Sequence, residues 1–222
     1  MGTIYLVRHG QASLGADDYD QLSDLGQRQS LRLGRYFAER GVAFDAVFTG
    51  TLKRHRQTLA GIADGLPGLP QSITWPGLDE YDSEAVIHAV HPAPMPRANT
   101  PEVIREHFRV LRTGLVAWMQ GRVQPEGMPS FTDFQAGVAG ALQQALMHHE
   151  GKVLLVSSGG PISTAVGLLL DLKPAAVVEL NMRLRNSAVS EFSATPKRHA
   201  LLTWNTLPHL DHPDYAGWAS HA

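Results

Sequence analysis

Short apolar runs rich in β-branched and aromatic residues recur along this chain, the pattern typical of strands. The run at 153–156 reads VLLV and has no polar position, which indicates a strand covered on both faces, as in a parallel sheet. The predicted strands are 3–7, 45–49, 73–75, 153–156, 187–192 and 200–204.

Between these runs, apolar residues return every three to four positions, the spacing of one helix face. Leu59, Ile62 and Leu66 carry the clearest such face. Ser23 is a predicted N-cap, and Gly41 is suited to the position just past the end of that helix. The predicted helices are 24–40, 52–66, 102–120, 131–149, and a last one that opens at the glycine pair 159–160 and runs to 170.

Strands and helices alternate, which favours an α/β fold with a mostly parallel central sheet. The stretch from about 84 to 130 departs from this order, because it holds six prolines and a single long helical segment. We therefore expect a single domain over 1–222, with an insertion at about 84–130 that covers a site.

Composition narrows the possible functions. The apolar fraction is 43%, the charged fraction 18% and the net charge −2, so nothing in the overall charge points to nucleic acid or an anionic membrane as partner. The chain has no cysteine, which excludes disulfides, cysteine nucleophiles and thiolate metal sites. No apolar run is long enough for a membrane span, and Arg8 and His9 interrupt the only candidate for a signal peptide, so we expect a cytoplasmic protein.

The first candidate chemistry is Arg8-His9-Gly10, directly after the first strand. Ligands bind at the carboxyl ends of strands in α/β sheets. The arginine fork suits a phosphate or carboxylate, the histidine suits a nucleophile, and the glycine would let backbone approach a ligand. These three residues alone fit a charged strand end with a solvated histidine equally well.

Further stretches accompany this tripeptide in a fixed order. They read YLVRHGQAS, LSDLGQRQ, FTGTLKRHRQT, GLDEYD, VLLVSSGGPIS and NTLPHL. Together, from about 3 to 210, they resemble the histidine phosphatase superfamily, the phosphoglycerate-mutase-like proteins. The resemblance implies a three-layer αβα sandwich whose site lies at the carboxyl ends of the strands and needs no cofactor and no metal.

The resemblance also implies roles for particular residues. His9 matches the histidine that attacks phosphorus and becomes phosphohistidine, and Arg8 matches a ligand of the phosphoryl oxygens. Arg54 takes the place of a second phosphate-binding arginine in the family pattern S-x-L-x-R-x-x-Q-T, with Thr49 where that pattern has serine. Arg56 competes for this role. A helix turns about 100° per residue, so only one of the two arginines can face the site, and we favour Arg54.

Glu80 matches the family's proton donor in the pattern L-x-E, with Asp79 and Asp82 as competing carboxylates. A bound phosphate would raise the pKa of Glu80 by like charge and keep it protonated. Arginines on either side of His9 would disfavour its imidazolium form and keep it a neutral nucleophile.

One position departs from the family pattern. Where it has S-H-G-G, this chain has Ser158, so a histidine that donates to the phosphoryl group is replaced by a hydroxyl. We expect Ser158 and the backbone N–H groups of Gly159 and Gly160 to face the phosphoryl site. A histidine at 158 would raise kcat in an otherwise unchanged pocket and lower it in a pocket reshaped around serine. Alternatively, a histidine of the insertion reaches the site: His88, His91 or His107.

The sequence thus predicts a metal-independent phosphomonoester hydrolase that acts on a small phosphorylated substrate through a phosphohistidine at His9. One alternative is a phosphoglycerate mutase-type phosphotransferase, although no paired-arginine segment follows Glu80. Another is a weakly active or inactive phospho-ligand-binding protein, because of Ser158. The i, i+3 spacing of His209 and His212 falls short of a metal site by itself.

Overall fold

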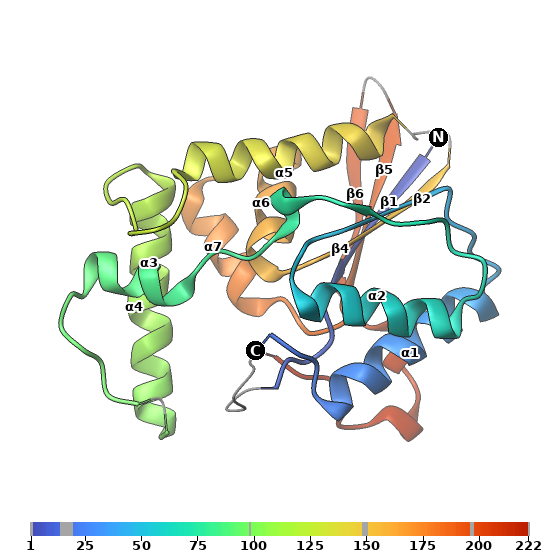
Figure 1. Ribbon diagram of the computed structural model, residues 1–222, viewed down its shortest axis with the longest axis horizontal. Coiled ribbons are helices and arrows are strands. Elements are labelled where there is room, and N and C mark those ends of the chain that lie inside the picture. The colour runs from blue at the N-terminus through green and yellow to red at the C-terminus, as the bar shows by residue number, and fades with distance from the viewer. Residues whose placement is uncertain (1, 14–19, 98, 148–150, 196–197, 222) are drawn as a thin grey trace.

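The computed structural model describes residues 2–13, 20–97, 99–147, 151–195 and 198–221 (Figure 1). Its centre is a six-stranded sheet of order β3-β2-β4-β1-β5-β6. The strands are β1 Gly2–Arg8, β2 Ala46–Thr49, β3 Ile73–Thr74, β4 Lys152–Ser157, β5 Val189–Thr195 and β6 Arg198–Thr206. The first four strands of that order are parallel, and β5 and β6 are antiparallel at one edge, so the predicted α/β fold with a mostly parallel sheet is confirmed.

Strand β4 lies between β1 and β2, which explains its unbroken apolar run. Its side chains alternate between two cores. Val153 and Leu155 belong to the core on one face of the sheet, and Leu154 and Val156 belong to the core on the other. All four are almost fully buried, as expected for a strand with helices on both sides.

Helices cover the sheet on both faces and complete the three layers (Figure 1). On one face lie α1 Asp24–Glu39 and α2 Lys53–Gly65, and on the other lie α5 Phe131–Leu146 and α6 Gly159–Leu170. A further helix that the sequence pattern did not indicate, α7 Pro174–Arg183, packs against α6.

Two helices form most of the insertion, α3 Ser83–Val90 and α4 Pro101–Met119. They stand beside the sheet, next to α7, at the left of Figure 1. The sequence predicted only the second of them. Helix α3 begins because the Asp82 carboxylate accepts the N–H groups of Glu84 and Ala85, at 2.9 and 3.0 Å.

Element ends differ from the sequence expectations by a few residues. Helix α5 ends at Leu146, not at 149, and residues 148–150 lie outside the described part of the chain. Strand β5 begins at Val189, two residues later than predicted, and continues to Thr195. Within the described ranges, no helix combines the length and the apolar character that a membrane span requires.

Candidate active site

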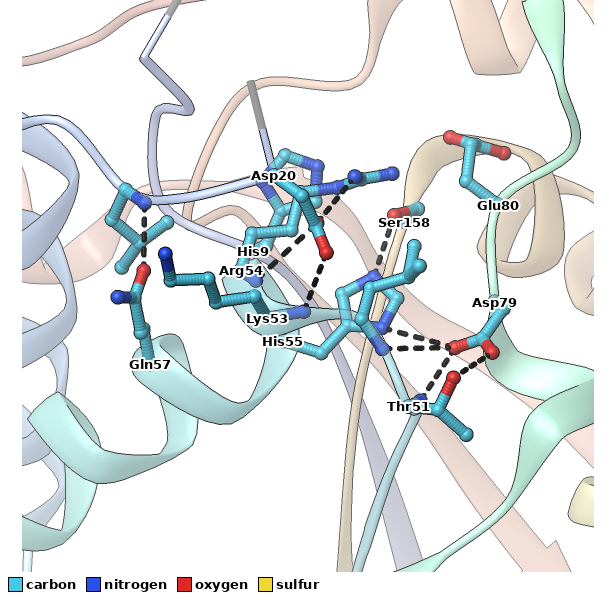
Figure 2. A network of polar contacts seen from close by, with 12 residues as sticks. His9, Asp20, Thr51, Lys53, Arg54, His55, Gln57, Asp79, Glu80 and Ser158 are labelled. Atoms are coloured by element: carbon cyan, nitrogen blue, oxygen red, sulfur yellow. Dashed lines mark hydrogen bonds and ion pairs between the residues drawn. The ribbon is translucent and has the colours of Figure 1, made fainter. Parts of the chain in front are cut away.

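The candidate site lies where neighbouring parallel strands end. Strands β2, β4 and β1 lie side by side, so the segments that follow them meet at one edge of the sheet. His9 follows β1, Ser158 follows β4, and the turn after β2 leads into α2, which carries Arg54 and His55. Figure 2 shows these side chains together, with Glu80 facing them from the loop before α3.

The hydrogen bonds of His9 determine which ring nitrogen can react. The side chain is only 4% exposed, and its Nδ1 lies 2.6 Å from the carbonyl oxygen of Gly10. A carbonyl can only accept, so Nδ1 carries the hydrogen and Nε2 keeps its lone pair. Burial, and then the charges of Arg8 and Arg54, hold the pKa of His9 well below its usual value. The sequence argument named the arginines alone, whereas the structure adds burial as the larger cause.

Gly10 lies in close contact with the first turn of α1. A Cβ at this position would lie 2.4 Å from the carbonyl oxygen of Gly26 on α1. A glycine is therefore required here, because the loop after β1 packs directly on α1 and leaves no room for a side chain. The Gly10 N–H also donates to Thr58 Oγ1 at 3.0 Å, which ties this loop to α2.

Two arginines are buried on either side of His9. Arg8 is 7% exposed and its Nη1 donates to the carbonyl oxygen of Leu184, whereas Arg54 is 8% exposed. Arg56 is exposed and its Nη1 donates to the carbonyl oxygen of Thr51. Helix α2 thus turns Arg54 inward and Arg56 outward, on the opposite sides that the helical periodicity requires.

The sequence analysis did not identify Asp20 as a residue of this site. Its Oδ1 accepts a hydrogen bond from Arg54 Nη1 at 2.7 Å, and its Oδ2 accepts the N–H of Lys53 at 2.7 Å. The carboxylate therefore caps the N-terminus of α2 and pairs with the arginine of the site. Asp20 is separated from Arg54 by more than thirty residues, so no local pattern could have indicated the pair.

Glu80 is held against the start of α6. Its Oε1 and Oε2 lie 3.0 and 3.3 Å from the N–H of Gly160, which donates to the carboxyl group. Burial raises the pKa of Glu80, although Arg54 and Arg8 oppose this. The sequence argument named the like charge of a bound phosphate as the cause, whereas the structure shows that burial by itself raises this pKa.

The other two carboxylates of this loop are unsuited to proton donation for different reasons. Asp79 accepts the N–H of Thr51 at 2.6 Å and also the Thr51 hydroxyl. Burial raises the pKa of Asp79, but His55 and Thr51 outweigh burial and lower it, so the carboxylate is ionised. Asp82 is exposed and caps α3.

The glycines at the start of α6 are required by their neighbours. A Cβ at Gly160 would lie 2.3 Å from Glu80 Oε1, and a Cβ at Gly159 would lie 2.3 Å from Asn181 Oδ1. The Gly160 N–H, expected to face a phosphoryl group, instead donates to Glu80. Gly159, the first residue of α6, remains a predicted phosphate ligand.

Ser158 has a partner within the protein, His55, which the sequence analysis had not singled out. Ser158 Oγ lies 2.7 Å from His55 Nε2, and both residues are fully buried. On the other side of the ring, His55 Nδ1 lies 3.6 Å from Asp79 Oδ1. The rings of His55 and His9 are 5.8 Å apart between centroids.

The remaining candidate histidines lie elsewhere. Those of the insertion line a pocket of about 370 Å³ beside α3: His88, His91 and His107. His209 is buried with its Nε2 2.9 Å from Ser187 Oγ, and His212 is exposed. Among the described residues, no group of three or more His, Asp or Glu side chains is arranged to hold a metal ion.

A pocket of about 480 Å³ adjoins Arg8. Helix α4 of the insertion forms one of its walls. The other walls come from the end of β1, from α7 with the residue that follows it, and from His221 near the C-terminus. The lining residues are Arg8, Arg105, Phe108, Arg112, Asn181, Met182, Leu184 and His221.

Comparison with protein families gives one match over most of the chain. A family model described as histidine phosphatase superfamily (branch 1) matches residues 4–207.

Two curated relatives match shorter segments. Over 90 residues the chain is 38% identical to a 2,3-bisphosphoglycerate-dependent phosphoglycerate mutase of Rhizobium rhizogenes. This alignment covers 36% of this chain and 42% of the mutase. Over 63 residues it is 35% identical to the broad-specificity phosphatase YOR283W of Saccharomyces cerevisiae, which covers 26% of this chain and 27% of that phosphatase. The aligned segments thus span less than half the length of these relatives.

Solved structures share the fold over nearly the whole chain. A phosphoserine phosphatase from Entamoeba histolytica, in complex with 3-phosphoglyceric acid, superimposes with a TM-score of 0.64 at 20% identity and covers 95% of this chain and 100% of its own. A phosphoglycerate mutase from Bacillus anthracis superimposes with a TM-score of 0.64 at 14% identity and covers 93% of this chain and 94% of its own.

Proposed function

Because this chain belongs to the histidine phosphatase superfamily (branch 1), we propose that it hydrolyses small phosphomonoesters through a phosphohistidine formed at His9. The observation that carries the proposal is the state of His9. Its Nδ1–H is held by the Gly10 carbonyl, its pKa is lowered by burial and by two arginines, and Nε2 is left as a neutral nucleophile.

In the first step, Nε2 of His9 attacks phosphorus and the bond from phosphorus to the ester oxygen breaks. Glu80 gives its proton to that oxygen, so the product leaves as an alcohol. Arg8 and Arg54 balance the negative charge on the phosphoryl oxygens throughout. The raised pKa of Glu80 suits it to this role, since the group must be protonated before the ester bond breaks.

In the second step, water attacks the phosphohistidine. Glu80, now a carboxylate, accepts a proton from that water as its oxygen bonds to phosphorus and the bond from phosphorus to Nε2 breaks. Inorganic phosphate leaves, and both His9 and Glu80 return to their starting states. The site needs no metal for either step as written, and the 480 Å³ pocket beside Arg8 accommodates the alcohol part of the substrate.

A phosphotransferase of the mutase type is the second candidate, favoured by the partial identity to the Rhizobium rhizogenes mutase. It shares the first step and differs only in the acceptor, which is a second phosphorylated substrate instead of water. Release of inorganic phosphate in stoichiometric amounts from a single phosphomonoester indicates hydrolysis. Transfer of a radiolabelled phosphoryl group to an added phosphoglycerate, without release of inorganic phosphate, indicates the mutase reaction.

The test of the proposal is covalent trapping at His9. Brief incubation with a radiolabelled phosphodonor should give an adduct that is acid-labile and base-stable and that maps to His9, and the His9→Ala variant should lose both the adduct and turnover. Its melting temperature should match that of the wild type. An acid-stable adduct on Ser158, or label on another histidine, would overturn the assignment.

A further inference from the structure

His55 is buried and directly follows Arg54 in the chain, but the proposed reaction does not use its imidazole. Both ring nitrogens face polar groups of other elements. Nε2 lies 2.7 Å from Ser158 Oγ and Nδ1 lies 3.6 Å from Asp79 Oδ1 (Figure 2). The three residues come from α2, from the end of β4 and from the loop before α3.

The His55 ring fits between these partners only because position 50 is a glycine. A Cβ on Gly50 would lie 2.2 Å from His55 Nδ1 and 2.5 Å from Asp79 Oδ1. Any side chain at Gly50 would therefore displace the imidazole or the carboxylate. The four residues fit one another closely: Gly50, His55, Asp79 and Ser158. We read this fit as a specific polar arrangement around the His55 ring and not as ordinary core packing.

Ser158 is the member of this arrangement closest to the proposed chemistry. In the parallel pairing of β1 with β4, Arg8 lies opposite Ser157, so the residues that follow, His9 and Ser158, lie beside each other. Figure 2 shows Ser158 between Arg54 and Glu80. The hydroxyl is thus placed at the wall of the space that a phosphoryl group on His9 would occupy.

We propose that His55 acts through Ser158 as a positioning residue for phosphoryl transfer, with Asp79 orienting the ring. The inference rests on the proposed function of His9. The Asp79 carboxylate lies 3.6 Å from Nδ1, at ion-pair distance, and its negative charge favours a hydrogen on that nitrogen. When His55 is protonated, Nε2–H donates to Ser158 Oγ, and the Ser158 hydroxyl hydrogen is free to donate to a phosphoryl oxygen. When His55 is neutral, Nε2 instead accepts that hydrogen and turns it away from the substrate.

The charged groups around His55 allow this change on substrate binding. Asp79 and Asp20 favour the protonated ring, and burial and Arg54 disfavour it, so that the pKa of the free enzyme's His55 is lowered. The ring of His9, itself neutral, completes the surroundings. A phosphoryl dianion beside Ser158 adds negative charge and shifts the balance toward protonation.

The same geometry decides what a histidine at 158 would do. Ser158 is fully buried and already in contact with the His55 ring, so Ser158→His places two imidazoles in space made for one. We therefore expect Ser158→His to lower kcat. Removing the first ring by His55→Ala should make room for the second and restore activity in the double variant.

The experiment measures kcat and KM for p-nitrophenyl phosphate in five proteins: His55→Ala, Ser158→Ala, Ser158→His, and the doubles His55→Ala with Ser158→Ala and His55→Ala with Ser158→His. The first two should each lose about 10- to 150-fold in kcat with little change in KM, the range for one hydrogen bond of charged type. Their double should lose no more than the worse single variant, because the two side chains act as one unit. The last double should exceed Ser158→His at least about tenfold.

The matched control is His209→Ala, which removes another fully buried imidazole hydrogen-bonded to a serine hydroxyl. It should lower the melting temperature and leave kcat within about twofold. Unchanged kcat in His55→Ala, or additive losses with no rescue in the swapped double, would overturn the inference while turnover by the wild type through His9 stands. Turnover that does not need His9 would overturn the proposed function and, with it, this inference.

Discussion

Arg54 in the candidate site and Arg109 in the insertion each pair with a carboxylate, yet the two pairs are built differently. Arg54 meets Asp20 from a distant part of the chain, with side chains 10% and 36% exposed. Arg109 meets Glu106 three residues before it on α4, with side chains 69% and 46% exposed. The first pair depends on the tertiary fold, and the second would form on any exposed helix of this sequence.

The difference separates polar groups that the fold withdraws from water from polar groups that remain in it. Burying Arg8 and Arg54, and partly burying Glu80, costs desolvation free energy, so their placement at one point needs a compensating function. The insertion is held against the rest of the fold by a cluster of aromatic side chains. Trp118 lies 5.2 Å from the rings of Phe131 and Phe134, and 6.1 Å from Tyr81, the neighbour of Glu80.

The largest effect is expected at Glu80, whose charge state only the fold controls. Glu80→Gln should lower kcat about 10²- to 10⁴-fold with alkyl phosphates, which need a proton on the leaving oxygen. The loss should be much smaller with p-nitrophenyl phosphate, whose leaving group needs little protonation. A loss of the same size with both substrates would mean that Glu80 is not the acid.

The same variant makes a prediction for the pH profile. The general acid must be protonated, so kcat/KM of the wild type falls as the pH rises through the pKa of Glu80. Burial raises that pKa, and the fall should therefore come at a higher pH than for an ordinary carboxyl group. Glu80→Gln should remove this alkaline fall and leave the acidic fall that comes from protonation of His9.

The next largest effect is expected at Arg54, compared with Arg56 on the same helix. Arg54→Ala removes a buried guanidinium and should lower kcat/KM about 10- to 150-fold for each hydrogen bond to phosphate that it makes. Arg56→Ala is the matched control, because that side chain is exposed, and it should stay within about twofold. Equal losses in the two variants would show that the wrong face of α2 has been assigned to the site.

The aromatic cluster of the insertion should matter for stability before it matters for catalysis. Trp118 is 1% exposed, and Trp118→Ala should lower the free energy of unfolding by about 3–5 kcal/mol, as measured by urea denaturation. Trp118→Phe keeps a ring in the cluster and should lose less. An alanine variant as stable as the wild type would show that the insertion does not depend on this cluster.

The smallest effect is expected for the exposed ion pair. Arg109→Ala should leave the melting temperature within about 1 °C of the wild type and kcat/KM within about twofold, because exposed pairs contribute little. A clear loss of kcat/KM with a bulky phosphomonoester and not with p-nitrophenyl phosphate would show instead that this face of α4 contacts the substrate.

The sequence by itself determined the features that repeat locally. The wholly apolar run of β4 identified a central strand, and the helical periodicity placed Arg54 and Arg56 on opposite sides of α2. The order of short motifs around Arg8-His9 indicated the superfamily to which the chain belongs. The strand and the helix face depend on residues within a few positions of one another, where backbone geometry alone relates the side chains. The superfamily assignment depends on the order of the motifs along most of the chain.

Only the tertiary structure decided which distant side chains meet. Ser158 and His55 are 103 positions apart and Asp20 and Arg54 are 34 apart, and neither pair leaves a local pattern. Their contact follows from the order β2-β4-β1 and from the approach of the loop before α1 to the start of α2. The protonation states of Glu80 and Asp79, adjacent in the chain, differ for the same reason, since burial and hydrogen-bond partners are set by the fold around each carboxyl group.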